Sequence, residues 1–167
     1  MPEPLPVRYA PRVNPVRKAA AVLFLSAASI LAVAVAVGGC ASIRPPAHTR
    51  PVVQTMRVTG YCKCGRCCGW RRNWLGMPVV ASGPHAGRPK VVGMTASGAR
   101  ARPGTIAADG ALYPFGTVMY VEGYGFGRVE DRGGAIKGQH IDLYFKTHAE
   151  AQQWGSKTMR VYVWRER

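Results

Sequence analysis

Apolar and polar residues alternate in short segments from about residue 55 to the end of the chain. Gly or Pro stands in nearly every gap between these segments. Such alternation, bounded by turn residues, is typical of short strands because successive side chains of a strand point to opposite faces. The pattern predicts strands at residues 55–61, 91–95, 105–109, 117–122, 126–131, 140–145 and 158–164.

A helical pattern occurs at residues 148–154. Thr147 precedes it as a predicted N-cap, Glu150 follows in the capping-box position, and Gly155 ends it. Many short strands with one or two short helices predict a mostly β fold. We expect the strands to close into a small barrel rather than an open α/β sheet.

Residues 69–93 have no regular pattern and are predicted to form a long loop. Loops of this length are usually functional or mobile. The segment is rich in aromatic and basic residues, namely Trp70, Arg71, Arg72, Trp74, His85, Arg88 and Lys90.

Residues 1–39 predict a signal peptide or a membrane anchor. Basic residues precede an uncharged run at 19–37, which ends in Val37-Gly38-Gly39-Cys40. The small residues before the cysteine favour a cleaved leader with lipid attached to Cys40. Alternatively, the run would span about 28 Å as an uncleaved helix, just enough to cross a membrane. Both interpretations place the rest of the chain in the cell envelope, membrane-anchored and facing the periplasm, and the first favours an outer-membrane lipoprotein.

The composition changes after this leader. Residues 40–53 are rich in Pro, Arg, Ser and Thr and predict a tether, whereas residues 54–167 predict the folded domain. The whole chain has a formal net charge of +15, and residues 40–167 keep 19 Lys and Arg against 7 Asp and Glu, a formal +12. Such charge favours an anionic polymer as partner. An exported protein rarely meets nucleic acid, so we expect a cell-envelope polymer such as peptidoglycan instead.

Four cysteines form a dense cluster near the start of the domain. The spacing C-x-C-x-x-C-C is compatible with a thiolate zinc site, with disulfides or with free thiols. Adjacent ligands would crowd a tetrahedral site, and an oxidising envelope favours disulfides. We therefore expect at least one disulfide and no metal, with the pairing left open among Cys62, Cys64, Cys67 and Cys68.

Aspartate occurs three times in the chain, at Asp109, Asp131 and Asp142. In segment 140–145 the alternation places Ile141 and Leu143 on one face, and Asp142 on the other, away from the core. Asp131 begins a Gly-rich segment, which is expected to return the chain beside the strand of Asp142. A single aspartate at a strand end more often caps a turn. The three aspartates are therefore considered together as a candidate site.

Five ordered motifs carry a family resemblance. They are Thr95-Ala96-Ser97-Gly98, residues 102–109, residues 113–117, the block Glu130-Asp131-Arg132-Gly133-Gly134-Ala135-Ile136-Lys137-Gly138, and His140-Ile141-Asp142-Leu143-Tyr144-Phe145. Their order resembles the three-aspartate (3D) domain family. The last two motifs are similar to the catalytic domain of the membrane-bound lytic transglycosylase A family.

This resemblance implies a six-stranded double-psi β-barrel that cleaves the MurNAc–GlcNAc bond of peptidoglycan without water or a cofactor, leaving 1,6-anhydro-MurNAc. By position, Asp142 matches the general acid and base, and Asp131 and Asp109 match two supporting carboxylates. Arg132 departs from the family pattern, in which a small or β-branched residue is more common.

The same motifs give the expected glycan-binding residues. They are Thr95, Ser97, Gly133, Gly134, Lys137, His140 and Tyr144, with Tyr61 and Trp70 as further side chains that could flank a sugar ring. We expect a monomer that binds peptidoglycan glycan strands and the membrane through its N-terminus. Two alternatives remain open, a non-catalytic wall-binding module and a glycoside hydrolase that uses Asp131 and Asp142.

Overall fold

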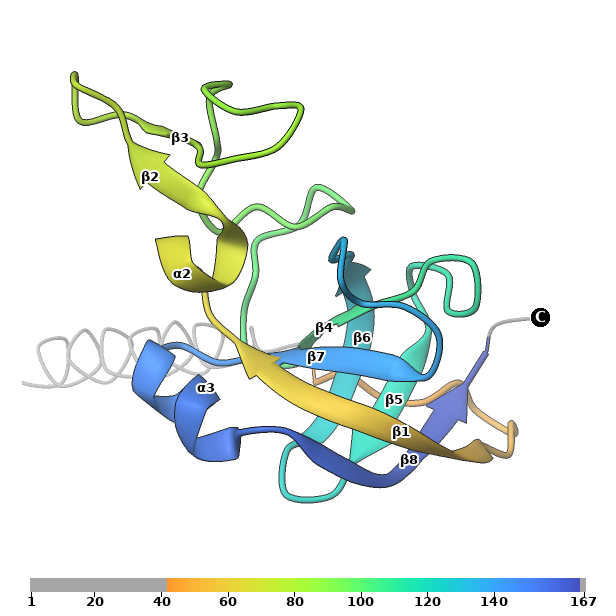
Figure 1. Ribbon diagram of the computed structural model, residues 1–167. Helices are drawn as coiled ribbons and strands as arrows, with labels where there is room; N and C mark the ends of the chain where they lie inside the picture. The colour runs from red at the N-terminus through yellow and green to blue at the C-terminus, as the bar shows by residue number, and fades with distance from the viewer. Residues whose placement is uncertain (1–41, 166–167) are drawn as a thin grey trace, which may run out of the picture. The chain divides into compact units, whose positions relative to one another are not determined.

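The structure is a computed structural model that describes residues 42–165 (Figure 1). The predicted signal or anchor segment and Cys40 lie outside the described residues. Within residues 42–165 no helix is long and apolar enough to span a membrane. The described residues from Ile43 onward form one compact unit.

Six strands close into a barrel in the order β1–β7–β4–β6–β5–β8. The pairs β1–β7 and β4–β6 are parallel, and the other four pairs are antiparallel. The prediction of a mostly β, closed six-stranded barrel with one or two short helices is therefore confirmed, and the described residues form two such helices. The strands are β1 (Val52–Tyr61), β4 (Thr105–Ala108), β5 (Val118–Val121), β6 (Gly125–Asp131), β7 (His140–Tyr144) and β8 (Lys157–Trp164).

The barrel core is built by alternate residues of these strands. On β7, Ile141 and Leu143 are fully buried, and they pack in one cluster with Val58, Ile106 and Val161 from three other strands. Burial of each such side chain contributes about 1.5–3 kcal/mol. The period-two prediction for β7 is thus confirmed, and the residues between the core positions face the other way.

The helix α3 (His148–Trp154) begins and ends where the sequence predicts. The Thr147 hydroxyl accepts a hydrogen bond from the Glu150 backbone N–H, and the Glu150 side chain accepts one from the Thr147 N–H. This reciprocal cap satisfies two donors that a helix start otherwise leaves unpaired.

Removing the cap should destabilise the fold. Thr147→Ala is expected to lower the free energy of unfolding by about 1 kcal/mol, because the Glu150 N–H loses its acceptor. Chemical denaturation measures the difference. Thr147→Ser is the matched control, since serine keeps the hydroxyl. Equal losses for both variants would contradict the capping role.

Two sequence-based assignments are wrong between residues 65 and 95. Residues 91–95 do not form a strand, because Gly93 has a φ of 77° and Met94 makes only an isolated bridge to Arg100. The predicted loop at 69–93 contains a hairpin of β2 (Trp70–Arg72) and β3 (Pro78–Val80). A four-residue helix, α2 (Gly65–Cys68), precedes it. Figure 1 shows this hairpin projecting from the barrel beyond α2.

The residues just before β1 contact the barrel. The Trp164 indole N–H donates to the Thr49 carbonyl at 3.3 Å, and β1 begins at Val52, two residues before the predicted domain start. This part of the predicted tether is therefore held against β8.

Candidate active site

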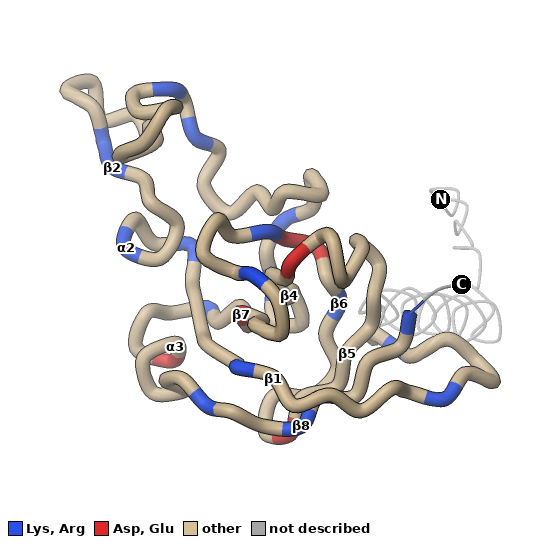
Figure 2. The backbone as a smooth tube through the Cα atoms, turned by 45° about the vertical axis from the view of Figure 1, so that its right-hand side comes forward, with Lys and Arg blue, Asp and Glu red and all other residues tan. Residues whose placement is uncertain are grey.

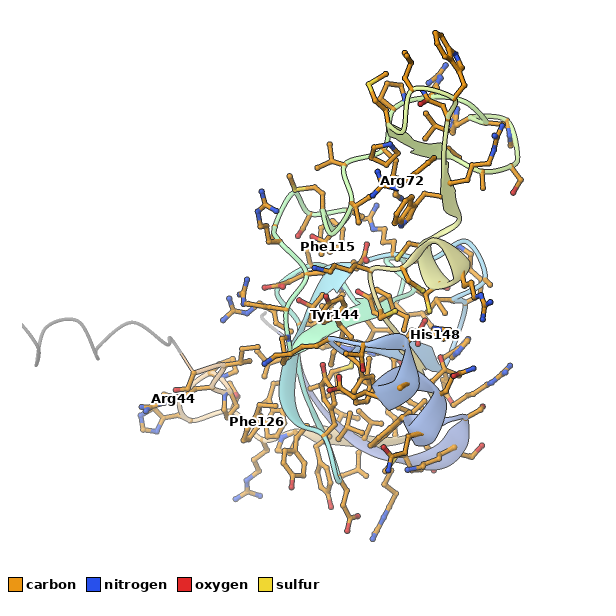
Figure 3. The ribbon with its side chains drawn as sticks, turned by 90° about the vertical axis from the view of Figure 1, so that its left-hand side faces the viewer. Arg44, Arg72, Phe115, Phe126, Tyr144 and His148 are labelled. Atoms are coloured by element: carbon orange, nitrogen blue, oxygen red, sulfur yellow. The ribbon has the colours of Figure 1, made fainter. Side chains whose placement is uncertain are left out.

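A cavity of about 470 Å³ opens between the barrel and the α2 segment. Asp131, at the end of β6, and Asp142, in β7, line it from the barrel. Figure 3 shows Tyr144 at the end of the barrel that faces α2, while Arg72 lies out in the hairpin. The other lining residues are Tyr61, Lys63, Cys67, Cys68, Trp70, Lys90, Gly93, Met94, Thr95, Ala96, Ala101, Ala107, Arg132, Gly133, Gly134, Ile136 and Tyr144.

The strand register explains why the two carboxylates share this cavity. Ala107 of β4 pairs with Asp142 of β7 on one side and with Asp131 of β6 on the other. Side chains at paired positions lie on the same face of a sheet. Ala107 therefore forms the floor between the two acids, and its small side chain leaves the space above them open.

Asp142 is held by a hydrogen bond from the neighbouring strand. Thr59 pairs with Asp142 in the parallel register, and its hydroxyl donates to Asp142 Oδ1 at 2.8 Å. Burial, opposed by the Thr59 hydrogen bond and reinforced by the negative charge of Asp131, raises the pKa of Asp142 to about 6. A carboxyl group in this range exchanges its proton near neutral pH, as general acid–base catalysis requires.

His140 contacts the same hydroxyl from outside the cavity. Its Nε2 lies 3.0 Å from Thr59 Oγ1. When that hydroxyl donates to Asp142, a protonated Nε2 of His140 can donate to the Thr59 oxygen. Burial lowers the pKa of His140, and the nearby Arg57 lowers it further. His140 thus does not line the cavity, and Thr59 lies between it and Asp142.

Asp131 is fixed by three donors. Its Oδ1 accepts from the backbone N–H groups of Ala96 at 2.9 Å and Arg132 at 2.8 Å, and its Oδ2 accepts from the Tyr61 hydroxyl at 3.0 Å. Burial raises the pKa of Tyr61, and the charge of Asp131 raises it further, so this phenol stays a donor. The carboxylate is therefore oriented at the edge of the cavity.

Asp109 does not line the cavity. Its carboxylate accepts hydrogen bonds from the backbone N–H groups of Gly138 at 3.0 Å and Ala111 at 3.1 Å. The Gly138 bond and then the Ala111 bond hold the pKa of Asp109 below its ordinary value. The side chain ties the turn after β4 to the end of the Gly-rich segment 132–138, four residues of which line the cavity.

The expected glycan-binding residues divide into two groups. Residues that line the cavity are Thr95, Gly133, Gly134, Tyr144, Tyr61 and Trp70. Ser97, Lys137 and His140 do not line it. The Ser97 hydroxyl instead lies 3.1 Å from the Thr95 hydroxyl, and Lys137 is exposed on the Gly-rich turn.

Sequence reasoning missed three kinds of residue at this site. Thr59 was detectable in principle, because it alternates with Tyr61 on the strand that pairs with β7. Ala107 lies between the two aspartates only through the register of β4. Lys63 and Lys90 reach the cavity from segments whose path the sequence does not indicate.

Positive charge surrounds the carboxylates. Figure 2 shows Lys and Arg spread along the described chain, from the hairpin through α2 to β8. Lys63, Lys90 and Arg132 line the cavity itself, and the Arg132 guanidinium lies 4.2 Å from the centre of the Phe115 ring. The cavity thus combines two half-buried acids with a cationic rim.

The predicted disulfide is not formed in the structure, where all four cysteines of the cluster are free thiols. Cys67 and Cys68 line the cavity wall. The Cys68 thiol donates to the Cys62 carbonyl at 3.2 Å.

The chain is similar in part to two cell-wall proteins of Bacillus subtilis. The cell wall-binding protein YocH of Bacillus subtilis (strain 168) is 37% identical over 91 residues, which cover 52% of this chain and 32% of YocH. YabE of the same organism, whose name assigns it to cell wall shaping, is 41% identical over 58 residues, covering 35% of this chain and 14% of YabE. This chain thus spans about a third or less of either relative.

Solved structures of MltA from E. coli also resemble the chain in part. One is 27% identical and covers 46% of this chain and 29% of MltA, with a TM-score of 0.36. Another, with bound chitohexaose, is 26% identical and covers 41% of this chain and 26% of MltA, with a TM-score of 0.35. The 3D domain family model matches residues 104–165, which contain all three aspartates. This match agrees with the family resemblance that the ordered motifs carry.

Proposed function

We propose that the chain is a peptidoglycan lytic transglycosylase, which cleaves the MurNAc–GlcNAc bond and forms 1,6-anhydro-MurNAc during cell-wall turnover or remodelling. One observation carries the proposal. Asp142 lies in an open cavity, with a pKa raised to about 6, and a second, fixed carboxylate shares the cavity.

The first step uses the protonated form of Asp142. Its proton goes to the glycosidic oxygen as the bond from that oxygen to C1 of MurNAc breaks. Positive charge then develops on the sugar ring, and the negative charge of Asp131 stabilises it. The hydrogen bond from Thr59 keeps Asp142 oriented while the proton moves.

The second step uses Asp142 as a base. It removes the proton from the C6 hydroxyl of the same MurNAc, and the freed oxygen attacks C1 to close the 1,6-anhydro ring. Asp142 ends in its initial protonated form, and no water is consumed. One carboxyl group thus performs both proton transfers. Its pKa therefore has to lie near the working pH, so that the group can give up a proton in the first step and take one up in the second.

The cavity walls suit a glycan of this kind. Tyr61, Trp70 and Tyr144 offer aromatic surfaces beside the carboxylates, and the cationic rim of Lys63 and Lys90 can attract the acidic groups of MurNAc and its stem peptide. Asp109 enters the proposal as a positioning residue, because it fixes the Gly-rich segment rather than facing the cavity.

We place this activity in the cell envelope, where the named relatives bind or shape the wall. The proposed partner is the glycan strand of peptidoglycan. Attachment to the membrane through a lipid on Cys40 or through an N-terminal helix, and a monomeric state, remain predictions from the sequence.

A wall-binding module without activity is the second candidate, and the name of YocH favours it. The full-length chain should be incubated with purified peptidoglycan, and both sedimented protein and released muropeptides should be measured. The proposal expects binding together with release of anhydro-muropeptides. Binding without release would favour the module, and release of muropeptides with a reducing MurNAc end would identify a glycoside hydrolase.

A further inference from the structure

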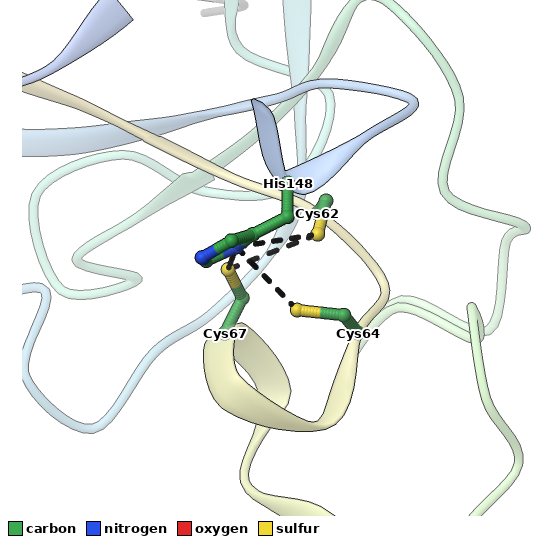
Figure 4. Close-up of side chains that lie close together, drawn as sticks. All are labelled: Cys62, Cys64, Cys67 and His148. Carbon is green, nitrogen blue, oxygen red and sulfur yellow. Dashed lines mark hydrogen bonds between the residues drawn. The ribbon is translucent and has the colours of Figure 1, made fainter. Parts of the chain in front are cut away.

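Three cysteines and one histidine converge beside the cavity. The thiols of Cys62, Cys64 and Cys67 and the ring of His148 place one ligand atom each within 4.8 Å of one another. Figure 4 shows the three thiols directed at one edge of the His148 ring. Sequence reasoning considered the cysteines as a group of four and did not include this histidine.

The distances fit a tetrahedral zinc site. Zn–S bonds of about 2.3 Å and a Zn–N bond of about 2.0 Å imply S···S edges of about 3.8 Å and S···N edges of about 3.5 Å. The sulfurs of Cys62 and Cys67 lie 3.8 Å apart. His148 Nδ1 lies 3.4 Å from Cys67 Sγ, 3.6 Å from Cys64 Sγ and 4.0 Å from Cys62 Sγ.

The fourth cysteine stays outside this group. The Cys68 thiol donates to the Cys62 carbonyl rather than facing the His148 ring. The objection that Cys67 and Cys68 are too crowded to bind one ion therefore does not apply, because His148 supplies the fourth ligand. The sulfurs of Cys62 and Cys67 are also separated by nearly twice the roughly 2.05 Å length of a disulfide bond.

The fold brings these ligands together from distant positions in the sequence. Cys62 follows the end of β1, and the turn of α2 presents Cys64 and Cys67. His148 is the first residue of α3, 81 residues after Cys67. The helix approaches β1 closely at Gly60, where an added Cβ would lie 3.0 Å from the Ala151 carbonyl oxygen.

We propose that Cys62, Cys64, Cys67 and His148 bind one structural Zn²⁺ ion. Three thiolates and one imidazole favour zinc over hard cations such as Mg²⁺ or Ca²⁺, which prefer oxygen ligands. Protein side chains occupy all four positions, so the site is closed and holds no water for catalysis. The ion would connect α2 to α3. Two residues of α2, Cys67 and Cys68, line the cavity, and α3 packs against β1 of the barrel.

Metal analysis of the full-length chain, purified without chelators, tests the site. We expect about one zinc ion per chain in the wild type and in the controls Cys68→Ser and His85→Ala. Cys64→Ser and His148→Ala should each retain less than about a tenth of this zinc under the same dialysis. Removing even a residue that hydrogen-bonds to a metal ligand lowers metal affinity about 10- to 100-fold, and these two variants remove a ligand itself.

X-ray absorption at the zinc edge keeps the proposal testable if the ligand variants fail to fold. The wild type should give three sulfur neighbours at about 2.3 Å and one nitrogen at about 2.0–2.1 Å. A wild-type chain without metal, or with a disulfide inside the cluster, would overturn the proposal. So would zinc that survives Cys64→Ser but is lost in Cys68→Ser. None of these readouts depends on glycan cleavage.

Discussion

Asp142→Asn is expected to lower the rate of anhydro-muropeptide release by about 10⁴-fold or more. General acid–base groups typically contribute about 10²- to 10⁴-fold, and this residue acts in both proton transfers. Asparagine has nearly the same shape and can still accept the hydrogen bond from Thr59. It cannot deliver or remove a proton, so rate is lost while glycan binding is retained. Release is measured by mass spectrometry of soluble products from wall material.

The stability of the same variant serves as its control. The carboxyl group has a pKa of about 6 in the fold against an ordinary value near 3.8, so the folded chain binds this proton more tightly than the unfolded chain does. Its contribution to stability is full below pH 3.8 and is lost as the pH rises through 6. Asp142→Asn should therefore be more stable than the wild type at pH 7.5, by on the order of 2 kcal/mol. A folded variant with near-wild-type release would refute the role of Asp142.

Asp131→Asn should have the next largest effect, a loss of about 10²-fold or more, because preorganised charge at the reacting centre is removed. It should also change the pH profile. The first step needs protonated Asp142, so the activity is expected to fall as the pH rises through about 6. The charge of Asp131 raises the pKa of Asp142, so its removal lowers that pKa and shifts this fall in activity toward lower pH. The other titratable groups that line the cavity remain in place; they are Tyr61, Tyr144, Lys63, Lys90, Arg132, Cys67 and Cys68.

Asp109→Asn is the matched control for this second prediction. It also replaces one of the three aspartate carboxylates by an amide. The side chain of Asp109, however, lies outside the cavity and accepts hydrogen bonds from backbone N–H groups. We expect a smaller loss of rate and no shift of the pH profile. A profile that shifts with Asp109→Asn but not with Asp131→Asn would contradict the assignment of the two residues.

The parts of the fold that follow a local rule could be predicted from the sequence. Alternation on β7 fixes Ile141 and Leu143 in the core and turns Asp142 the other way, because the period of a strand is two. The cap of α3 could be predicted because Thr147 and Glu150 contact each other within one turn. The Gly-rich segment after Asp131 predicted that the two carboxylates would lie close, and both line the cavity.

Features that depend on long-range contacts could not be predicted in this way. The place of Ala107 between the two acids follows from a register shift between β4 and β6. The residue that lies beside the cysteines is His148. It follows Cys67 by 81 residues, so a rule based on local spacing could not identify it. The hairpin of β2 and β3 was missed since its strands have three residues each, too few to reveal a period.

Isotope labelling of the reaction products tests the central claim most directly. Peptidoglycan should be digested by the full-length chain in water enriched in ¹⁸O, with Asp142→Asn as the background. A transglycosylase closes the ring with the sugar's own C6 oxygen, so the account predicts anhydro-MurNAc ends that carry no ¹⁸O. MurNAc ends that contain one ¹⁸O atom at C1, formed by the wild type and not by Asp142→Asn, would contradict it.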